Sequence, residues 1–302
     1  MPRGGGMSRG VALLVTASVL FGASAIFVKL SYDHGAGVLT VLAARYLGGL
    51  VVVAPLSRWK ARGAWRAAEK RWRWAVIGLC NVASAGSYMA ALSLDSVGRV
   101  ATIVFVFPVL GAALGWVLFR VPLGPRLAVA LIVGLTGTML VFGDGIGVPD
   151  KLAAGLIAIG TAFTAAAYFV LAARWSGGEW LPAMTTVFAF GALLYVPLAV
   201  GTGSGLPSGR GWLWIGLLAA LGTAVPYLLQ MSAISAVGST KAGVLAMIEP
   251  MVSVLGAMAV LGEGMTGLQG AGAALVLASF ALASIPGLRL RRARPAAEGG
   301  FR

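Results

Sequence analysis

Long apolar runs separated by short polar segments follow one another along the chain. Ten runs have about the 20 residues that a helix needs to cross the hydrocarbon core of a bilayer. The apolar positions are continuous rather than alternating, so they predict helices and not the strands of a membrane barrel. The predicted spans cover residues 10–30, 37–57, 74–94, 98–119, 127–144, 152–173, 181–202, 211–233, 240–261 and 266–286.

The pattern of apolar runs and prolines occurs twice in the chain, as an internal repeat. Proline interrupts the fourth predicted helix at Pro108 and the ninth at Pro250, 142 positions apart. The W-x-W segments that begin the third and eighth helices, 72–74 and 212–214, are 140 positions apart, which indicates a two-residue insertion or deletion there. The offset of 142 also pairs Ala91 with Ala233 and Gly49 with Gly191.

An odd number of helices in each copy has a consequence for orientation. With five spans per copy, the second copy must enter the membrane from the side opposite to the first. The predicted fold is therefore an all-α polytopic membrane protein, with ten transmembrane helices arranged as two inverted five-helix repeats around a central cavity. The repeats are predicted over residues 10–145 and 152–286, and residues 287–302 form a basic cytoplasmic tail.

Composition excludes a soluble domain. Of the 302 residues 59% are hydrophobic and only 11% are charged, whereas a soluble protein has about a quarter of its residues charged. The net charge of +14 would indicate nucleic-acid binding in a soluble protein. Here most lysines and arginines lie between spans on one predicted side, so they indicate topology instead, with both termini in the cytoplasm.

The localisation that follows is the bacterial inner (plasma) membrane, with many passes. The loop from Arg58 to Arg73 carries tryptophans among its cations. It is interpreted either as an amphipathic segment on the anionic inner leaflet or as a loop that only sets topology. One cysteine and one histidine leave no disulfide framework and no zinc site. No metal or other cofactor is predicted.

Two charges fall well inside predicted spans, where an ionised side chain costs at least about 2.5–3.5 kcal/mol and is by default a functional candidate. Glu249 directly precedes Pro250, and Arg45 lies within the second helix. Proline frees a backbone carbonyl one turn earlier, so Glu249 is a candidate for binding a substrate amino group or cycling a proton. The alternative is structural: Glu249 pairs with Arg45, and Arg45 braces the bundle.

Three further cations lie near helix ends. Lys29 is interpreted as an anchor at the end of the first helix, with a gate role as the alternative. Arg99 and Lys241, near the starts of the broken helices, are candidates for attracting a substrate carboxylate at opposite entrances.

Polar side chains form stripes along three helices. Residues three and four positions apart share a helix face, so the stripes can line a cavity with hydrogen-bonding groups and aromatic walls. The alternative is that they hydrogen-bond between helices and hold the bundle together. The candidate lining residues are Asn81, Ser84 and Tyr88 in the third helix, Tyr168 in the sixth, and Tyr227 and Gln230 in the eighth.

These features together resemble the EamA family of the drug/metabolite transporter superfamily. The resemblance spans about residues 10–286 and is strongest over 91–141 and 233–284, which share an apolar run, the proline and a last helix. The second copy has the family's Leu261-Gly262-Glu263, whereas Val121 replaces that acid in the first. The resemblance implies a cavity lined by the first, third, fourth, sixth, eighth and ninth helices, with the fifth and tenth at the back, and amino acids, metabolites or small drugs as cargo.

The predicted function is therefore an inner-membrane secondary transporter that exports amino acids or related small metabolites by alternating access. One alternative is an exporter of small cationic drugs or polyamines, attracted by Glu249. A membrane-embedded lipid-linked transferase is the alternative from another class; it needs carboxylates at the membrane face, and the cytoplasmic loops offer only Glu69 and Glu179. The predicted partners are a small-molecule substrate and the bilayer, without nucleic acid, in a monomer or homodimer.

Overall fold

The computed structural model describes residues 4–62, 71–142, 149–261 and 266–284, and these are almost entirely helical, with no strand among them. The first copy contains α1 (Gly4–Asp33), α2 (Val38–Lys60), α3 (Arg71–Leu92), α4 (Val97–Val104), α5 (Phe107–Phe119) and α6 (Pro125–Val141). The second contains α7 (Leu152–Trp175), η4 (Gly177–Glu179), α8 (Trp180–Gly201), α9 (Gly211–Ala219), η5 (Ala220–Ala224), α10 (Val225–Val237), α11 (Ser239–Ala246), α12 (Ile248–Leu261) and α13 (Gly267–Ser284).

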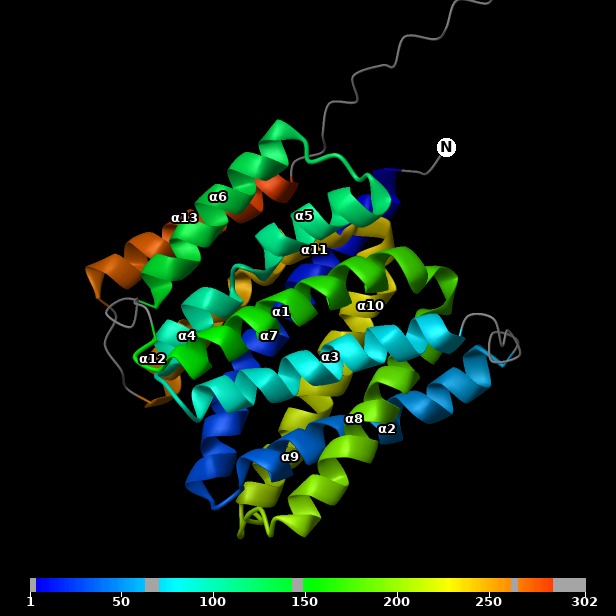
Figure 1. Cartoon of the computed structure of the whole chain (residues 1–302), viewed down its shortest axis with the longest axis vertical. Coiled ribbons are helices and arrows are strands. Elements are labelled where there is room, and N and C mark those ends of the chain that lie inside the picture. The colour runs from blue at the N-terminus through cyan, green and yellow to red at the C-terminus, as the bar shows by residue number, and fades with distance from the viewer. Residues whose placement is uncertain (1–3, 63–70, 143–148, 262–265, 285–302) are drawn as a thin grey trace, which may run out of the picture.

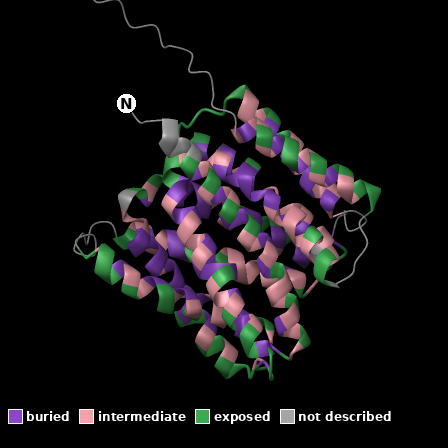
Figure 2. Cartoon of the chain, turned by 180° about the vertical axis from the view of Figure 1, so that it is seen from behind, coloured by how far each residue is buried: buried purple, intermediate pink, exposed green. Residues whose placement is uncertain are grey.

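The helices agree with the predicted spans. Among the described residues, nine stretches are long and apolar enough to cross a membrane, and α6 is a shorter apolar helix. Large apolar side chains are exposed on the outer surfaces of the bundle; Val51, Ile132 and Leu193 are 66%, 66% and 75% exposed. Figure 2 shows exposed, half-buried and buried positions interspersed along the helices. Such a surface suits lipid, because hydrocarbon tails solvate apolar side chains as well as a protein interior does.

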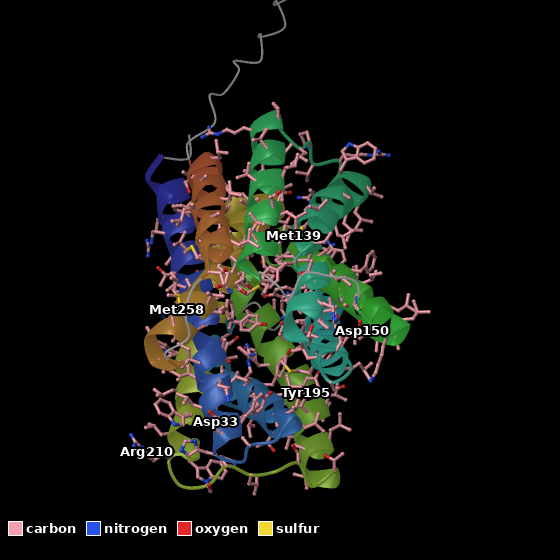
Figure 3. The ribbon with its side chains drawn as sticks, turned by 90° about the vertical axis from the view of Figure 1, so that its left-hand side faces the viewer. Asp33, Met139, Asp150, Tyr195, Arg210 and Met258 are labelled. Atoms are coloured by element: carbon pink, nitrogen blue, oxygen red, sulfur yellow. The ribbon has the colours of Figure 1, made fainter. Side chains whose placement is uncertain are left out.

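The two copies are inverted relative to each other. The link from α1 to α2 meets the link from α8 to α9 at one end of the bundle, where the Gly37 N–H donates to the Gly205 carbonyl (2.8 Å) and the Ser208 N–H to that of His34 (2.9 Å). Figure 3 shows Asp33 and Arg210 at this end. At the other end, Trp72 at the start of α3 packs on Trp175 at the end of α7, with ring centroids 5.1 Å apart. The α1–α2 link and its repeat equivalent, the α7–α8 link, therefore lie at opposite ends of the bundle.

A pair of reciprocal contacts marks the pseudo-twofold relation between the copies. A Cβ atom on Gly191 of α8 would overlap the ring of Tyr46 on α2, and one on Gly49 of α2 would overlap the ring of Phe188 on α8. Both pairs, Tyr46 with Phe188 and Gly49 with Gly191, are separated by the repeat offset of 142 residues. Each aromatic ring therefore occupies the space that the partner's glycine leaves open.

Helices α6 and α13, the fifth and tenth spans, pair along one edge of the bundle (Figure 1). Their backbones are in direct contact, because a Cβ on Gly272 would lie 2.7 Å from the Gly137 carbonyl oxygen. Small residues permit this close approach of membrane helices. The expected position of these two helices, away from the centre, is thus found.

Three spans are irregular. The fourth is divided between α4 and α5, two residues before Pro108, and the ninth between α11 and α12 at Met247, shortly before Pro250. The eighth span contains the π-helix η5. It lies in the stretch where the repeat offset changes from 140 to 142. The two broken helices meet where Gly243 of α11 faces Pro108, 2.9 Å from a Cβ built on that glycine.

Some sequence predictions lie outside the described residues. They are the basic tail over 287–302, the acid at Glu263 and most of the loop between Lys60 and Arg71, including Glu69.

Candidate functional site

A hydrogen-bonded chain of polar side chains crosses the boundary between the two copies. The Tyr46 hydroxyl on α2 donates to the Asn81 Oδ1 on α3 (2.8 Å). The Asn81 Nδ2 donates in turn to the Tyr227 hydroxyl oxygen on α10 (3.0 Å). Asn81 is buried and Tyr227 is half-buried. Because Tyr227 accepts this bond, its own O–H remains available as a donor.

Aromatic rings surround Tyr227. Its ring meets those of Phe21, Phe188 and Tyr168 edge-on, with centroids 4.9, 5.6 and 6.4 Å apart. The buried Tyr168 hydroxyl on α7 donates to the Gln230 Oε1 on α10 (3.0 Å). The Tyr168 hydroxyl and the Gln230 side chain are therefore hydrogen-bonded to each other, which is the interhelical alternative considered for the polar stripes. The Tyr227 ring is enclosed by other aromatic rings.

The remaining stripe residues lie along the contact of α3 with α7. The Ser84 hydroxyl is 3.5 Å from the Thr161 carbonyl oxygen, and the Thr161 hydroxyl donates to that of Ser87 (2.8 Å). These bonds join one helix of each copy. Tyr88, one turn beyond Ser84, is half-buried and within electrostatic range of Glu249.

Arg45 and Glu249 both lie between the copies. The Arg45 Nε on α2 donates to the Thr223 hydroxyl in η5 (3.2 Å). Glu249 is half-buried in the first turn of α12. There α12 touches α1, because a Cβ on Gly22 would lie 2.6 Å from the Glu249 carbonyl oxygen. The Ser253 hydroxyl fixes the same contact by donating to the Gly22 carbonyl (2.9 Å).

The two charges are near each other without touching. Arg45 lies close enough to act electrostatically on Glu249, and both act on Tyr227. Within the described part of the chain no ion pair joins Arg45 to Glu249. The direct salt bridge considered for this pair is therefore not the arrangement found. At the repeat offset, Val187 occupies the position of Arg45 and Phe107 that of Glu249, so each copy contributes one charge of opposite sign.

The other predicted cations lie toward the helix ends. Lys29 pairs with Asp33 (2.6 Å), and both side chains are about half exposed. Arg99 bonds to both Asp95 and Asp150 (2.7 Å each), and so ties the α3–α4 link to the residues before α7. Lys241 is half-buried at the start of α11.

Asp95 is the centre of the cluster at the α3–α4 link. It accepts hydrogen bonds from the backbone N–H groups of Ser96 and Asp150 as well as from Arg99. Burial opposes ionisation of Asp95, but these bonds outweigh it, so the pKa of Asp95 lies below its ordinary value. Arg99 is consequently engaged by two carboxylates.

A separate cleft of about 240 Å³ lies at the N-terminal end of α1, where α1 meets α10. Its lining residues are Arg9, Gly10, Leu13, Ser232, Ala233 and Ala236. Among the described residues, no group of three or more His, Cys, Asp or Glu side chains is placed to hold a metal ion.

Tyr46 is central to this site, and sequence reasoning did not select it as a lining residue. The signal for Tyr46 is its position next to Arg45, since an aromatic hydroxyl inside a membrane span needs a partner. Thr223 belongs to the same polar stripe of the eighth span as Tyr227 and Gln230, and it lies at the repeat equivalent of Asn81, 142 positions later.

Comparison with protein families gives one match, found twice in the chain. The model of the EamA-like transporter family matches residues 8–143 and again residues 152–285. A solved structure has the same fold, with a TM-score of 0.80 over 91% of this chain and 96% of the other, at 19% identity.

Curated relatives are also similar to the chain. An uncharacterized transporter from Archaeoglobus fulgidus is 28% identical over 285 residues, covering 92% of this chain and 97% of its own. The threonine/homoserine exporter RhtA of Salmonella typhimurium is 31% identical over 172 residues, which are 55% of this chain and 49% of the exporter. The second similarity thus extends over about half of each protein.

Proposed function

The chain belongs to the EamA-like transporter family, and from that premise we propose that it is a secondary transporter exporting amino acids or related small metabolites. The observation that carries the proposal is the pair Arg45 and Glu249, opposite charges placed by two inverted repeats at their common boundary. Charges at membrane depth are costly and mark substrate pathways. A site between inverted repeats opens to each side in turn when the repeats rock.

The proposed site residues are those that surround these charges. Irregular backbone adjoins both, since Thr223 belongs to the π-helix and Glu249 follows the break at Met247. Broken spans near the midplane are where transporters of this design hold their substrates. The proposed lining side chains are Asn81, Ser84, Tyr88, Tyr168, Tyr227 and Gln230, with Pro108 and Pro250 at the breaks of the mobile helices.

Amino-acid cargo has two supports. RhtA, similar over about half of the chain, is named as a threonine/homoserine exporter. The site also offers a cation for a carboxylate and an anion for an ammonium group. The alternative of a small-drug or polyamine exporter accounts for Glu249 but not for Arg45, which would repel a cationic substrate from the same site.

We propose the inner membrane as the location, with both termini in the cytoplasm. The N-terminal end of the bundle gathers cations against aromatic rings. Arg73 lies 5.6 Å from the centre of the Trp72 ring and 6.0 Å from that of Trp175, and Arg174 lies 5.6 Å from that of Phe119. Arginine and tryptophan at one bundle end suit an anionic headgroup region, and the excess of basic residues supports a cytoplasmic position for that end.

The test is counterflow in proteoliposomes containing the purified protein, with a panel of radiolabelled amino acids and cationic drugs. We expect exchange of at least one amino acid above protein-free liposomes, and a large decrease of that exchange in Glu249→Gln at low substrate concentration. The matched control Asp33→Asn removes an exposed acid at the bundle end and should transport normally. Exchange of cationic drugs without exchange of any amino acid would refute the proposed cargo.

A further inference from the structure

We infer that Arg45 and Glu249 form a divided site for one zwitterion, in which Arg45 holds the carboxylate and Glu249 the ammonium group of the same molecule. The inference rests on the proposed transport function and adds the chemical class of substrate. Each repeat supplies one of the two charges, so the substrate itself bridges the copies.

Position along the spans supports a shared role for these two residues. In the described parts of the ten spans, the other charged side chains lie within five residues of a span end, where they reach a membrane surface. Arg45 and Glu249 lie further inside. Their repeat equivalents, Val187 and Phe107, are apolar, and Phe107 packs on Phe169 with ring centroids 4.9 Å apart. The fold therefore does not require a charge at either position.

The geometry holds the two charges apart. The Arg45 Nε–H donates to the Thr223 hydroxyl of the second copy, so the N–H groups of the two terminal guanidinium nitrogens can donate to another acceptor. Glu249 is fixed from the other side, since α12 is fastened to α1 at Gly22. Each charge is therefore anchored against the opposite copy. A ligand that carries both signs can satisfy both groups, and a ligand with one sign leaves the other charge buried and unpaired.

Tyr227 is near both charges. It is within electrostatic range of Arg45 and of Glu249. Its hydroxyl oxygen accepts from Asn81, so its own O–H remains available to donate to a further acceptor. A substrate carboxylate beside Arg45 is such an acceptor. Tyr88, which also lies near Glu249, offers a second hydroxyl on the ammonium side.

The specificity that follows is defined by two groups on one ligand. Free α-amino acids have a carboxylate and an ammonium group on the same carbon, and their charges cancel those of the site. Monoamines, polyamines and simple carboxylates each lack one group, and a site built to bond a charged group rejects ligands that lack it.

The experiment uses the amino acid exchanged fastest in the panel above, with its methyl ester, which lacks the carboxylate, and its N-acetyl derivative, which lacks the ammonium group. Competition with radiolabelled amino acid in wild-type proteoliposomes measures all three affinities. We expect each derivative to bind at least about tenfold more weakly than the amino acid itself, which corresponds to one lost charged contact. Equal competition by all three compounds overturns the inference.

Substitutions test which residue binds the carboxylate and which binds the ammonium group of the substrate. Glu249→Gln should weaken the amino acid and the methyl ester at least about tenfold and leave the N-acetyl derivative within about twofold. Arg45→Gln should weaken the amino acid and the N-acetyl derivative and spare the methyl ester. Arg210→Gln, an exposed charge removed at the bundle end, is the matched control and should change none. Equal weakening of all three compounds in both variants contradicts the assignment.

Two failures remain distinguishable. If no amino acid is exchanged by the wild-type protein, the proposed function fails. If amino acids are exchanged but their derivatives compete equally, the function stands and the divided site fails. The wild-type derivative series decides between these outcomes even where a variant does not fold.

Discussion

Gly191→Ala tests the reciprocal ring contacts between the repeats, and the size of its effect can be worked from the structure. The added Cβ would overlap the ring of Tyr46. The Tyr46 ring is held in place, because its hydroxyl is hydrogen-bonded to Asn81 and its centroid lies 5.3 Å from that of the Tyr195 ring. Overpacking a rigid site costs about 1–3 kcal/mol, whereas replacing helical glycine by alanine gains at most about 1 kcal/mol. We expect a net loss of about 1–2 kcal/mol in the free energy of unfolding.

The same substitution elsewhere should have the opposite sign. Gly160 of α7 is also helical, but its position is exposed and a Cβ there meets nothing within 4 Å. Gly160→Ala should therefore stabilise the protein by about 0.4–1 kcal/mol. Gly49→Ala, the repeat equivalent of Gly191→Ala, should again destabilise it because the Cβ overlaps the ring of Phe188.

The assay is reversible unfolding of the purified protein by SDS in mixed micelles, followed by tryptophan fluorescence. The expected order of stability is Gly160→Ala, wild type, and then the two buried variants. If Gly191→Ala and Gly160→Ala shift the midpoint equally in the same direction, the close approach of α2 and α8 is refuted.

Three further predictions concern separate parts of the structure. Tyr46→Phe removes the hydrogen-bond donor to the buried Asn81 amide, so it should lower the free energy of unfolding by about 1 kcal/mol and also weaken substrate binding. Tyr195→Phe loses a hydrogen bond to a backbone carbonyl and should lower stability alone. Equal substrate binding by the two variants would contradict this prediction. Because the pKa of Asp95 is lowered in the folded protein, its ionised carboxylate contributes stability above the unfolded-state pKa, and this contribution is lost as pH falls through the folded-state pKa. The difference in unfolding free energy between the wild type and Asp95→Asn should therefore shrink on acidification. A difference that stays constant with pH would show that Asp95 does not titrate in this way. In a variant without the native cysteine, a cysteine replacing His34 should react with an impermeant thiol reagent added to intact cells and one replacing Arg120 should not; the reverse pattern would invert the proposed topology.

Much of the architecture follows from the sequence because lipid imposes simple rules. Spans must be continuous apolar helices, and the repeat offset fixes their equivalence. The family match confirms the repeat, and the helices fall within a few residues of their predicted limits, with the fifth span at Pro125–Val141 rather than 127–144. The π-helix η5 was not predicted. Helical periodicity of 3.6 cannot show a widened turn, although the change of repeat offset marks its place.

Pairing of polar side chains is harder to read from sequence. A polar stripe in the sequence predicts which residues share a helix face. The sequence does not show which neighbouring helix that face meets. Only the packing reveals that Tyr168 bonds to Gln230 and Asn81 to Tyr227. In a bilayer many hydrogen-bonding partners are equivalent by composition, and the choice depends on distances set by small residues such as Gly191.

The asymmetry between the repeats is as informative as their symmetry. Contacts such as Tyr46 with Gly191 have counterparts in the other copy, so the two repeats pack against each other in equivalent ways. That equivalence suits alternating access, but a perfectly symmetric site would offer the same chemistry from both sides. A ligand with two different ends needs two different groups. In the proposed divided site these two groups are Arg45 of the first copy and Glu249 of the second, at positions where the other copy has the apolar Val187 and Phe107.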